Sequence, residues 1–389
     1  MLLNTGLVSP ALLLLVAGGA SAQLANSVTA FTTLQTWYNN STGLWNTAGW
    51  WNAANSLTVV AELAAADSSI LDEALSIFET TYSVAPSANP SNGLEKKVES
   101  NGDIVTIYPA GWPYNLLEKR ASSDSSDPSA WLDGANDDAE WWALAWIAAY
   151  DVTGNDTYLA LAEGIFSDIA NSWGTYCGDG GIYWETTNNY VNAIANELFI
   201  SLAAHLANRV PGNSTTYIAW AEKAWNWFAT SGMINAEGTI NDGLTTNCTN
   251  NNQTTWSYNQ GVILGGLVEL NKASANQSYI DSANSIAEAA ISALADSNYV
   301  IHDACEPDCA PDATQFKGIF IRNLLLLQDA SPKDLYTEVM QACATSIWAN
   351  DRDNGTNELS VDWSGPFISP ANSSTHSSAM DALIAAISI

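Results

Sequence analysis

The chain has 389 residues, of which 41 are Asp or Glu and only 11 are Lys or Arg, so its formal net charge is −30. A surface with this charge repels nucleic acid and anionic membranes, which disfavours both as partners. Solubility outside the cell accounts for the charge by itself, and a neutral sugar polymer is a compatible partner.

The N-terminus is typical of a secretory signal. A short apolar run, Ala11 to Val16, precedes a small-residue stretch that ends at Ala22, which predicts a signal over residues 1–22. The run is shorter than the roughly 20 apolar residues that span a bilayer, and no later segment is long enough. The C-terminus lacks the hydrophobic tail of a lipid-anchor signal. We therefore expect a secreted protein, extracellular or associated with the cell wall, whose residues 23–389 form one domain.

Sequons and cysteines agree with export. The Asn-x-Ser/Thr sequons begin at Asn39, Asn40, Asn155, Asn213, Asn247, Asn252, Asn276, Asn354 and Asn372. An exported chain permits disulfides. Cys305 and Cys309 are close enough to clip one loop. Cys177 and Cys248 lie in comparable Gly- and Asn-rich loops, so we expect them to pair, whereas Cys343 falls in an apolar helical stretch and should be buried and free. The histidines show no ligand spacing, so we expect no zinc site.

Hydrophobic periodicity predicts about twelve helices. In chain order they cover residues 27–40, 50–65, 69–82, 137–151, 156–172, 190–208, 214–231, 257–272, 276–294, 316–328, 333–349 and 374–387. A weak repeat runs through them, because similar helix starts recur at Tyr158, Tyr217 and Tyr279, with a fainter copy at Tyr336. The period of about 60 residues gives roughly six repeats of two helices each.

Two kinds of helix alternate along the chain. The helices that start near Tyr158 and Tyr279 are apolar on one face only. The segments Trp141–Tyr150, Val191–Leu206 and Ile319–Leu327 are apolar nearly all round, which predicts burial on every side. An inner ring of buried helices inside an outer ring of amphipathic ones satisfies both patterns. We therefore predict an all-α fold, an (α/α)6 barrel of six helical hairpins.

The irregular part of the chain runs from about residue 84 to 134. It is rich in Ser, Asp and Pro and separates the third predicted helix from the fourth. We expect an insertion that is either a surface excursion or a wall of the binding cleft. Strand signals are few, but Asp103-Ile-Val-Thr-Ile-Tyr108 is suited to one strand of a hairpin within it.

The strongest chemical signal is a pair of neighbouring carboxylates, Asp137 and Asp138, at the start of a helix that is otherwise suited to burial. Buried, unpaired carboxylates are costly, so the pair should face a solvated pocket. Two negative charges this close oppose joint ionisation, which gives one proton donor and one anion, as a glycosidase requires. Retaining glycosidases hold the two groups about 5–5.5 Å apart, which neighbours at a helix start can reach. The alternative is a helix cap, since Asp is favoured in the first turn.

Other polar and aromatic motifs begin the predicted inner helices. They comprise Tyr183 and Trp184 after a Gly-rich loop, Asn192 and Asn196, the run Tyr258-Asn259-Gln260, and Lys317 with Arg322. Aromatic faces suit sugar rings, and polar groups inside such helices need partners that sugar hydroxyls can supply. The alternative for the 17 tryptophans is core packing, and for the two cations it is structural ion pairing. In a ring of hairpins the inner helices start on one face, so that face should carry a polar, aromatic and acidic cleft.

Five motifs together resemble glycoside hydrolase family 76. They are Asp137-Asp-x-x-Trp-Trp-Ala-Leu-Ala-Trp-Ile, Gly-Gly-Ile-Tyr-Trp184, Asn192-Ala-Ile-Ala-Asn-Glu-Leu-Phe, Trp256-Ser-Tyr-Asn-Gln-Gly-Val-Ile-Leu-Gly-Gly and Phe316-Lys-Gly-Ile-Phe, within residues 27–387. The resemblance implies an (α/α)6 fold and a retaining endo-α-1,6-mannanase, with Asp137 as nucleophile and Asp138 as general acid/base. The implied sugar contacts are Trp142, Tyr183, Trp184, Asn192, Asn196, Tyr258, Asn259, Gln260 and Lys317.

The same resemblance leaves two alternatives open. One is a cell-wall transglycosidase that uses the same carboxylates on mannan or on mannose-containing anchor glycans. The other is a non-catalytic wall protein that binds mannan. In each case the expected partner is α-1,6-linked mannan or a mannooligosaccharide, the expected cofactor is none, and we expect a monomer.

Overall fold

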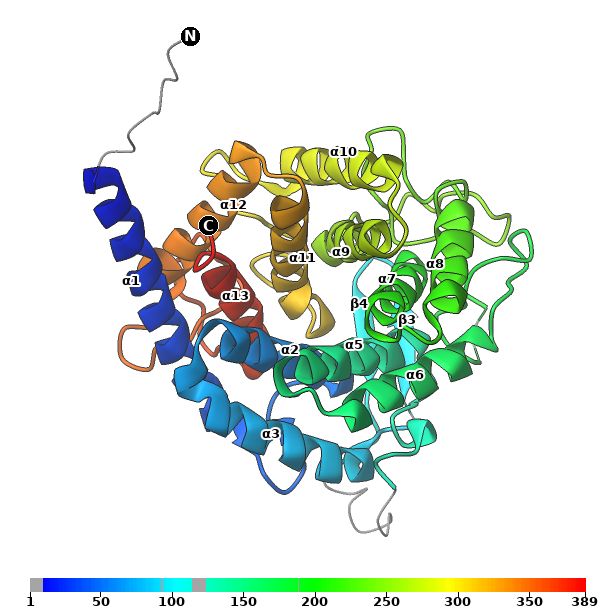
Figure 1. The fold of residues 1–389 in the computed structure, drawn as a ribbon, viewed down its shortest axis with the longest axis horizontal. Coiled ribbons are helices and arrows are strands. Elements are labelled where there is room, and N and C mark those ends of the chain that lie inside the picture. The colour runs from blue at the N-terminus through cyan, green and yellow to red at the C-terminus, as the bar shows by residue number, and fades with distance from the viewer. Residues whose placement is uncertain (1–9, 92–93, 114–123, 188) are drawn as a thin grey trace.

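The computed structural model describes residues 10–91, 94–113, 124–187 and 189–389. Within them, the helices form two concentric rings (Figure 1). The inner ring contains α2 (Trp50–Ala66), α5 (Asn136–Thr153), α7 (Ala193–Arg209), α9 (Ser257–Ala273), α11 (Phe316–Ala330) and α13 (Ser373–Ala385). The outer ring contains α1 (Pro10–Leu34), α3 (Leu71–Val84), α6 (Asp156–Ala170), α8 (Ser214–Phe228), α10 (Gln277–Leu294) and α12 (Asp334–Ser346). Each inner helix contacts the next, and α13 contacts α2, which closes the inner ring. The fold is the predicted (α/α)6 barrel.

Burial follows the two helix patterns. Every residue of α9 from Ser257 to Leu270 is buried, because this inner helix is covered on all sides. In α10, by contrast, the buried residues between Tyr279 and Ile291 form a single stripe that faces the inner ring. Hydrophobic periodicity therefore distinguished the inner helices α5, α7 and α11 from the outer helices α6 and α10.

The predicted helix boundaries agree with the structure to within about three residues, except in the first helix. There the predicted span 27–40 is wrong, because α1 starts earlier and ends at Leu34. A 3₁₀ turn (Gln35–Trp37) leads to β1 (Tyr38–Asn39), which pairs with β2 (Leu44–Trp45). The hydroxyl of Tyr38 contacts that of Thr81 on α3 at 2.9 Å, which holds this small hairpin against the barrel. Helix α1 runs without a break through Ala22, and removal of residues 1–22 stays a prediction.

The repeated tyrosines join neighbouring outer helices. Tyr217 on α8 donates its hydroxyl to Glu163 on α6 at 2.8 Å. Tyr336 on α12 donates to Asn284 on α10 at 2.7 Å, and Tyr279 on α10 bonds to α8 in the same way. The weak sequence repeat therefore has a structural meaning, since Tyr217, Tyr279 and Tyr336 each join their outer helix to the outer helix before it.

The predicted disulfides are present. Cys177 pairs with Cys248 and Cys305 with Cys309, while Cys343 is a buried free thiol. Asn39 and Asn372 are half-buried, and the other sequon asparagines are exposed. None of the helices within the described residues combines the length and the apolar character needed to cross a bilayer.

The insertion before α5 contains the predicted strand. β4 (Ile104–Ile107) pairs antiparallel with β3 (Glu95–Val98), and Lys96 lies opposite Thr106. The two strands form a sheet of their own, which lies behind the inner helices in Figure 1. We call residues 95–107 the covering hairpin. The contacts of this hairpin reach the site described next, so this part of the insertion is not a surface excursion.

Candidate active site

The starts of the inner helices meet at one end of the barrel, as predicted. Asp137 and Asp138 lie in the first turn of α5. Ala135, just before α5, forms a β-bridge with Glu185 in the segment before α7. Asn192, the N-cap of α7, forms another with Gly243 in the segment before α9. These bridges join successive loops into a continuous rim around the carboxylate pair.

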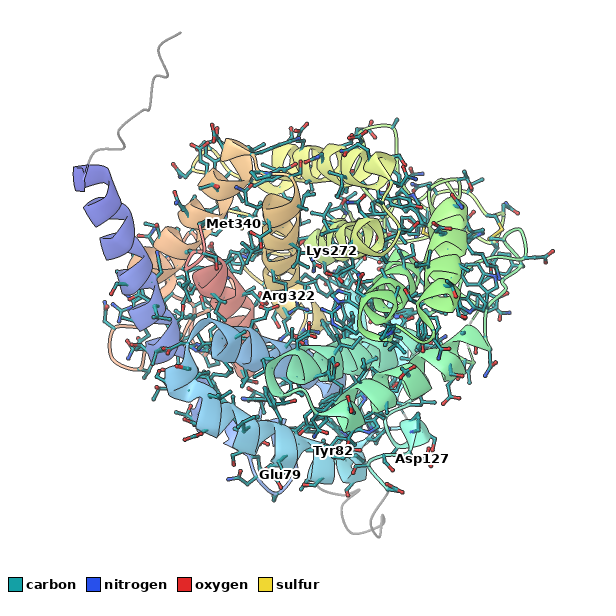
Figure 2. All side chains as sticks on the ribbon, viewed as in Figure 1. Glu79, Tyr82, Asp127, Lys272, Arg322 and Met340 are labelled. Atoms are coloured by element: carbon teal, nitrogen blue, oxygen red, sulfur yellow. A yellow bond between two sulfur atoms is a disulfide. The ribbon has the colours of Figure 1, made fainter. Side chains whose placement is uncertain are left out.

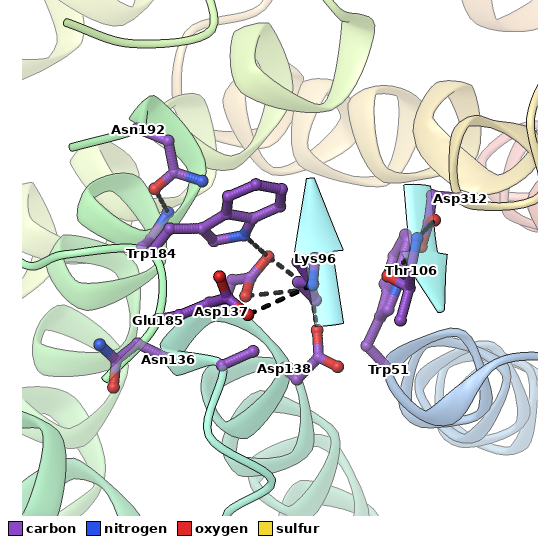
Figure 3. Close-up of polar contacts among 12 residues, drawn as sticks. Trp51, Lys96, Thr106, Asn136, Asp137, Asp138, Trp184, Glu185, Asn192 and Asp312 are labelled. Atoms are coloured by element: carbon purple, nitrogen blue, oxygen red, sulfur yellow. Dashed lines mark hydrogen bonds and ion pairs between the residues drawn. The ribbon is translucent and has the colours of Figure 1, made fainter. Parts of the chain in front are cut away.

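Asp137 and Asp138 both contact the ammonium group of Lys96 (Figure 3). Asp137 accepts hydrogen bonds from the indole Nε1 of Trp184 at 2.9 Å and from Lys96 Nζ at 3.0 and 3.1 Å. Asp138 is fully buried and also accepts a hydrogen bond from Lys96 Nζ. Because both carboxylates contact the same nitrogen, their nearest oxygens are no more than about 6 Å apart. This separation suits a retaining glycosidase.

A third carboxyl group makes the environments of the pair unequal. Burial raises the pKa of Asp138 well above its usual range; Lys96 opposes this rise, and the neighbouring Asp133 and Asp137 add to it. The neighbouring Asp133 is also buried, and burial raises its pKa to about 6. Neighbouring buried carboxyl groups oppose joint ionisation, which favours the protonated form of one of them. The site therefore offers a protonated carboxyl group beside the carboxylate that Trp184 orients.

Lys96 was missed by the sequence interpretation. It comes from β3, is 4% exposed, and its backbone N–H donates to Glu185 Oε1 at 3.3 Å. Burial acts to lower the pKa of its ammonium group, but Asp137 and Asp138 outweigh burial and raise it. Lys96 is therefore charged. The available signal was the rarity of basic residues in this chain, in which Lys96 and Lys97 are adjacent.

The other strand of the covering hairpin is fastened across the barrel end. Asp312, just before α11, accepts hydrogen bonds from Thr106 N at 2.7 Å and from Thr106 Oγ1 at 3.0 Å. The same carboxylate accepts the indole N–H of Trp51 on α2 at 2.7 Å (Figure 3). Tyr108 OH accepts the backbone N–H of Trp50 at 2.7 Å. The hairpin thus reaches from α5 on one side to α2 and α11 on the other.

Two cavities flank the covering hairpin. One, of about 490 Å³, is lined by Trp45, Asn52, Tyr108 and Asp312 among others. The second, of about 470 Å³, is lined by Lys96, Trp184, Tyr190 and Gln253 among others. Residues of the hairpin line both cavities, so the hairpin separates them.

Trp184 is the predicted contact residue that the structure places directly at the carboxylate pair. Tyr183 beside it is half-buried, and its hydroxyl accepts the backbone N–H of Tyr176 at 3.0 Å. Tyr258 is buried and stacks on Phe316 with ring centroids 3.8 Å apart. Burial and the charges of Asp242 and Asp137 raise the pKa of Tyr258 well above its usual range.

The predicted amide residues act mainly on the backbone. Asn196 accepts the N–H of Ile182 at 2.8 Å and donates to its carbonyl at 3.0 Å. Gln260 likewise accepts the N–H of Ile240 and donates to its carbonyl, both at 2.8 Å. Each amide fastens the loop before its helix, and this leaves it little capacity for a sugar hydroxyl. Asn192 caps α7, whereas both polar atoms of the fully buried Asn259 have no hydrogen-bond partner among the described residues.

Two further predicted contacts have structural roles. Trp142 is fully buried, with ring centroids 4.8 Å from those of both Trp50 and Trp131. A sugar contact for Trp142 would require this aromatic cluster to open. Lys317 is buried, pairs with Glu306 at 2.6 Å and donates to Val361 O at 2.7 Å. The structural ion pair that we kept as an alternative for Lys317 is therefore present.

One group of residues has the composition of a metal site. Potential ligand atoms of His302, Glu306 and Asp362 lie within 4.8 Å of one another. Glu306 already accepts hydrogen bonds from His302 at 2.7 Å and from Lys317. Lys317 supplies the positive charge that the carboxylate needs, so we assign no metal to this group.

A third cavity, of about 320 Å³, lies toward the opposite end of the barrel. Figure 2 labels two of its lining residues, Lys272 and Arg322, near the centre of the ring. Several of its charged groups are paired with one another, since Arg209 contacts Asp151 at 2.6 Å and Glu269 at 3.1 Å.

Comparison with known proteins shows the same family in sequence. The family model described as glycosyl hydrolase family 76 matches residues 116–388. The putative mannan endo-1,6-alpha-mannosidase C1198.07c of Schizosaccharomyces pombe is 31% identical over 242 residues, 57% of this chain and 54% of the relative. The mannan endo-1,6-alpha-mannosidase DFG5 of Candida albicans is 28% identical over 272 residues, 65% of this chain and 57% of the relative. The chain spans about half the length of these curated relatives.

A solved structure shares the fold. It is an inactive variant of the alpha-1,6-mannanase GH76A of Salegentibacter sp. HEL1_6, altered at two consecutive aspartates, in complex with alpha-1,6-mannotetrose. Its TM-score is 0.71 at 17% identity, covering 94% of this chain and 98% of that chain. The sequence match covers α5 to α13, including the helix that carries the carboxylate pair. On this evidence the chain belongs to glycoside hydrolase family 76.

Proposed function

We propose that the chain is a secreted, retaining endo-α-1,6-mannosidase that hydrolyses α-1,6-mannan backbones. The observation that carries the proposal is the unequal pair Asp137 and Asp138 at the start of α5. Membership of family 76 supports it, as do relatives whose names state this activity.

Asp137 has the surroundings of a nucleophile. Its carboxylate accepts the indole N–H of Trp184, which fixes its orientation. Attack on the anomeric carbon forms a glycosyl–Asp137 ester and breaks the glycosidic bond to the leaving sugar.

Asp138 has the surroundings of the general acid/base. Burial and two neighbouring carboxyl groups favour its protonated form, so it donates a proton to the leaving glycosidic oxygen. In the second step ionised Asp138 takes a proton from water, whose oxygen attacks the anomeric carbon and releases Asp137.

The test is an assay with α-1,6-mannotetraose and longer α-1,6-mannooligosaccharides, with products followed by NMR. Shorter products released in the α configuration are expected. Asp138→Asn should lower the rate by roughly 10²–10⁴-fold, since it removes proton transfer. Asp137→Asn should lower it at least as much, because no covalent intermediate forms.

The matched control is Asp156→Asn. Asp156, like Asp137, lies in the first turn of a helix, but it is exposed on α6. If Asp137 only stabilised the start of its helix, the Asp156→Asn and Asp137→Asn variants should behave alike. If Asp137 is catalytic, only Asp137→Asn should lose activity. Lengthened products would favour transglycosylation, and binding without turnover in both the intact chain and a Lys96→Met variant would contradict hydrolysis.

A further inference from the structure

We propose that the covering hairpin is a built-in inhibitor of the active site, and that Lys96 occupies the position between Asp137 and Asp138 that the scissile linkage must take. This inference rests on the proposed function of the pair. It predicts a latent form of the protein that becomes active when the hairpin moves away.

The position of Lys96 carries the argument. Its ammonium group lies 3.0 Å from Asp137 and in contact with Asp138 (Figure 3). In a retaining glycosidase the anomeric carbon and the glycosidic oxygen lie between these two groups. The transition state carries positive charge at the same place, so a lysine ammonium there is both a steric and an electrostatic substitute for it. Substrate and Lys96 cannot occupy this position together.

The contact is specific to one side of the strand. Lys96 is turned inward, with a side chain that is 2% exposed, whereas the neighbouring Lys97 side chain is 42% exposed and pairs with Glu99 at 2.7 Å. This alternation is that of a strand with one buried face. The buried face of β3 thus presents a single cation to the carboxylate pair.

Apolar contacts of Ile104, which is buried in the core, and of Val98 hold the hairpin together with a few polar contacts. Besides Lys96, these are the bonds of Thr106 to Asp312 and of Tyr108 to the backbone of Trp50. Its strands pair only with each other among the described residues, and a lone two-stranded hairpin is marginally stable by itself. An element of this kind can leave the barrel end without unfolding the rings.

The flanking cavities show what its departure would expose. The cavity beside Tyr108 and Asp312 and the cavity beside Trp184 lie on either side of the hairpin, at about 490 and 470 Å³. With the hairpin displaced, they would join across the carboxylate pair as one groove. An endo-acting enzyme needs sugar positions on both sides of the cleaved bond, which such a groove provides.

The first test is a pair of charge-removing variants. Lys96→Met keeps the length of the side chain but breaks its ion pairs. The fraction of molecules with the hairpin away from the carboxylate pair should therefore rise, and kcat/KM for α-1,6-mannotetraose should rise at least about tenfold with it. Lys333→Met removes an equal charge from an exposed pair with Glu288 on the outer ring and should leave kcat/KM within about twofold. A fall or no change with Lys96→Met overturns the proposal, provided that circular dichroism shows both variants folded.

The second test uses the intact chain and needs no variant. Hydrogen exchange of the amides in residues 95–107 is measured with and without saturating α-1,6-mannotetraose. Faster exchange on binding is expected, because the sugar displaces the hairpin. Unchanged or slower exchange in the bound state would show that the hairpin is a fixed wall of the site.

The two tests separate this inference from the proposed function. If the sugar binds and the hairpin opens but no product forms, the inhibitory role of the hairpin is supported and the hydrolase function is contradicted. If the intact chain hydrolyses the sugar while the amides of the hairpin stay protected from exchange, the hydrolase function is supported and the inhibitory role is contradicted.

Discussion

Asp138 combines complete burial with two neighbouring acidic groups, which distinguishes it from the adjacent Asp137. Burial raises the pKa of Asp138, and the negative charges of Asp133 and Asp137 raise it further. Asp137 differs because an indole N–H and an ammonium group stabilise its charge. The difference between the two aspartates therefore arises from their partners and not from their position in the helix.

Asp133→Asn should move the alkaline limb of the pH profile of kcat/KM to lower pH. The charge of Asp133 raises the pKa of Asp138, so its removal lowers that pKa, and the acid form that donates the proton is lost at a lower pH. Initial rates on α-1,6-mannotetraose across the pH range measure the limb. Asp303→Asn is the control, since Asp303 is also buried with its pKa raised to about 6 but bonds to Ser257 at the start of α9. An unmoved limb in Asp133→Asn would remove Asp133 from this role.

The sequence predicted the carboxylate pair but not the hydrogen-bond partners of several residues around it. Asn196 and Gln260 were expected to meet sugar hydroxyls, and both instead bind loop backbone. A side-chain amide satisfies either partner equally well, so residue type alone does not distinguish them. Lys96 was missed because its contact with Asp137 spans 41 residues and originates in a segment without helical periodicity.

At the scale of elements, local patterns determined what could be predicted. Helices were found because their apolar residues recur every three or four positions, a signal contained in each segment. The strand at Ile104–Ile107 was likewise predicted from a local signal, its run of four β-branched residues. Its docking over α5 and α11 was not, since docking depends on single polar contacts to Asp137, Asp138 and Asp312 that leave no periodic trace.

Close approach of the inner helices depends on glycine. A Cβ added at Gly261 on α9 would lie 2.5 Å from the Cα of Phe320 on α11. Because this is a backbone atom, no change of side-chain rotamer can relieve the clash. Gly261→Ala should therefore lower the free energy of unfolding by roughly 1–3 kcal/mol, because the two helices must separate. Gly212→Ala is the control: its added Cβ would meet nothing within 4 Å, so stability should change by less than about 0.5 kcal/mol. Urea denaturation measures both, and equal stabilities would contradict tight packing at Gly261.

At the scale of the whole molecule, the closed ring must fold against a large net charge. The six-hairpin arrangement brings α13 back to α2, so residues more than 300 positions apart hydrogen-bond, as Ser374 does with Asn52. Acidic residues outnumber basic ones 41 to 11, and most have no cationic partner available. Long-range repulsion therefore opposes the compact state at neutral pH.

Sodium chloride should accordingly stabilise the protein at pH 7. Raising the concentration from about 10 to about 200 mM shortens the Debye length from roughly 30 Å to below 10 Å, which screens repulsion across the surface. Tm from thermal unfolding should rise, since the net charge is −30 and few exposed ion pairs are weakened in exchange. The same increase near pH 4.1, the isoelectric point, should have little effect, because net repulsion is absent there. Chloride is preferred to sulfate, which strengthens apolar burial by itself. A Tm that falls with salt at pH 7 would show that specific ion pairs, such as Arg209 with Asp151 and Glu269, outweigh the general repulsion.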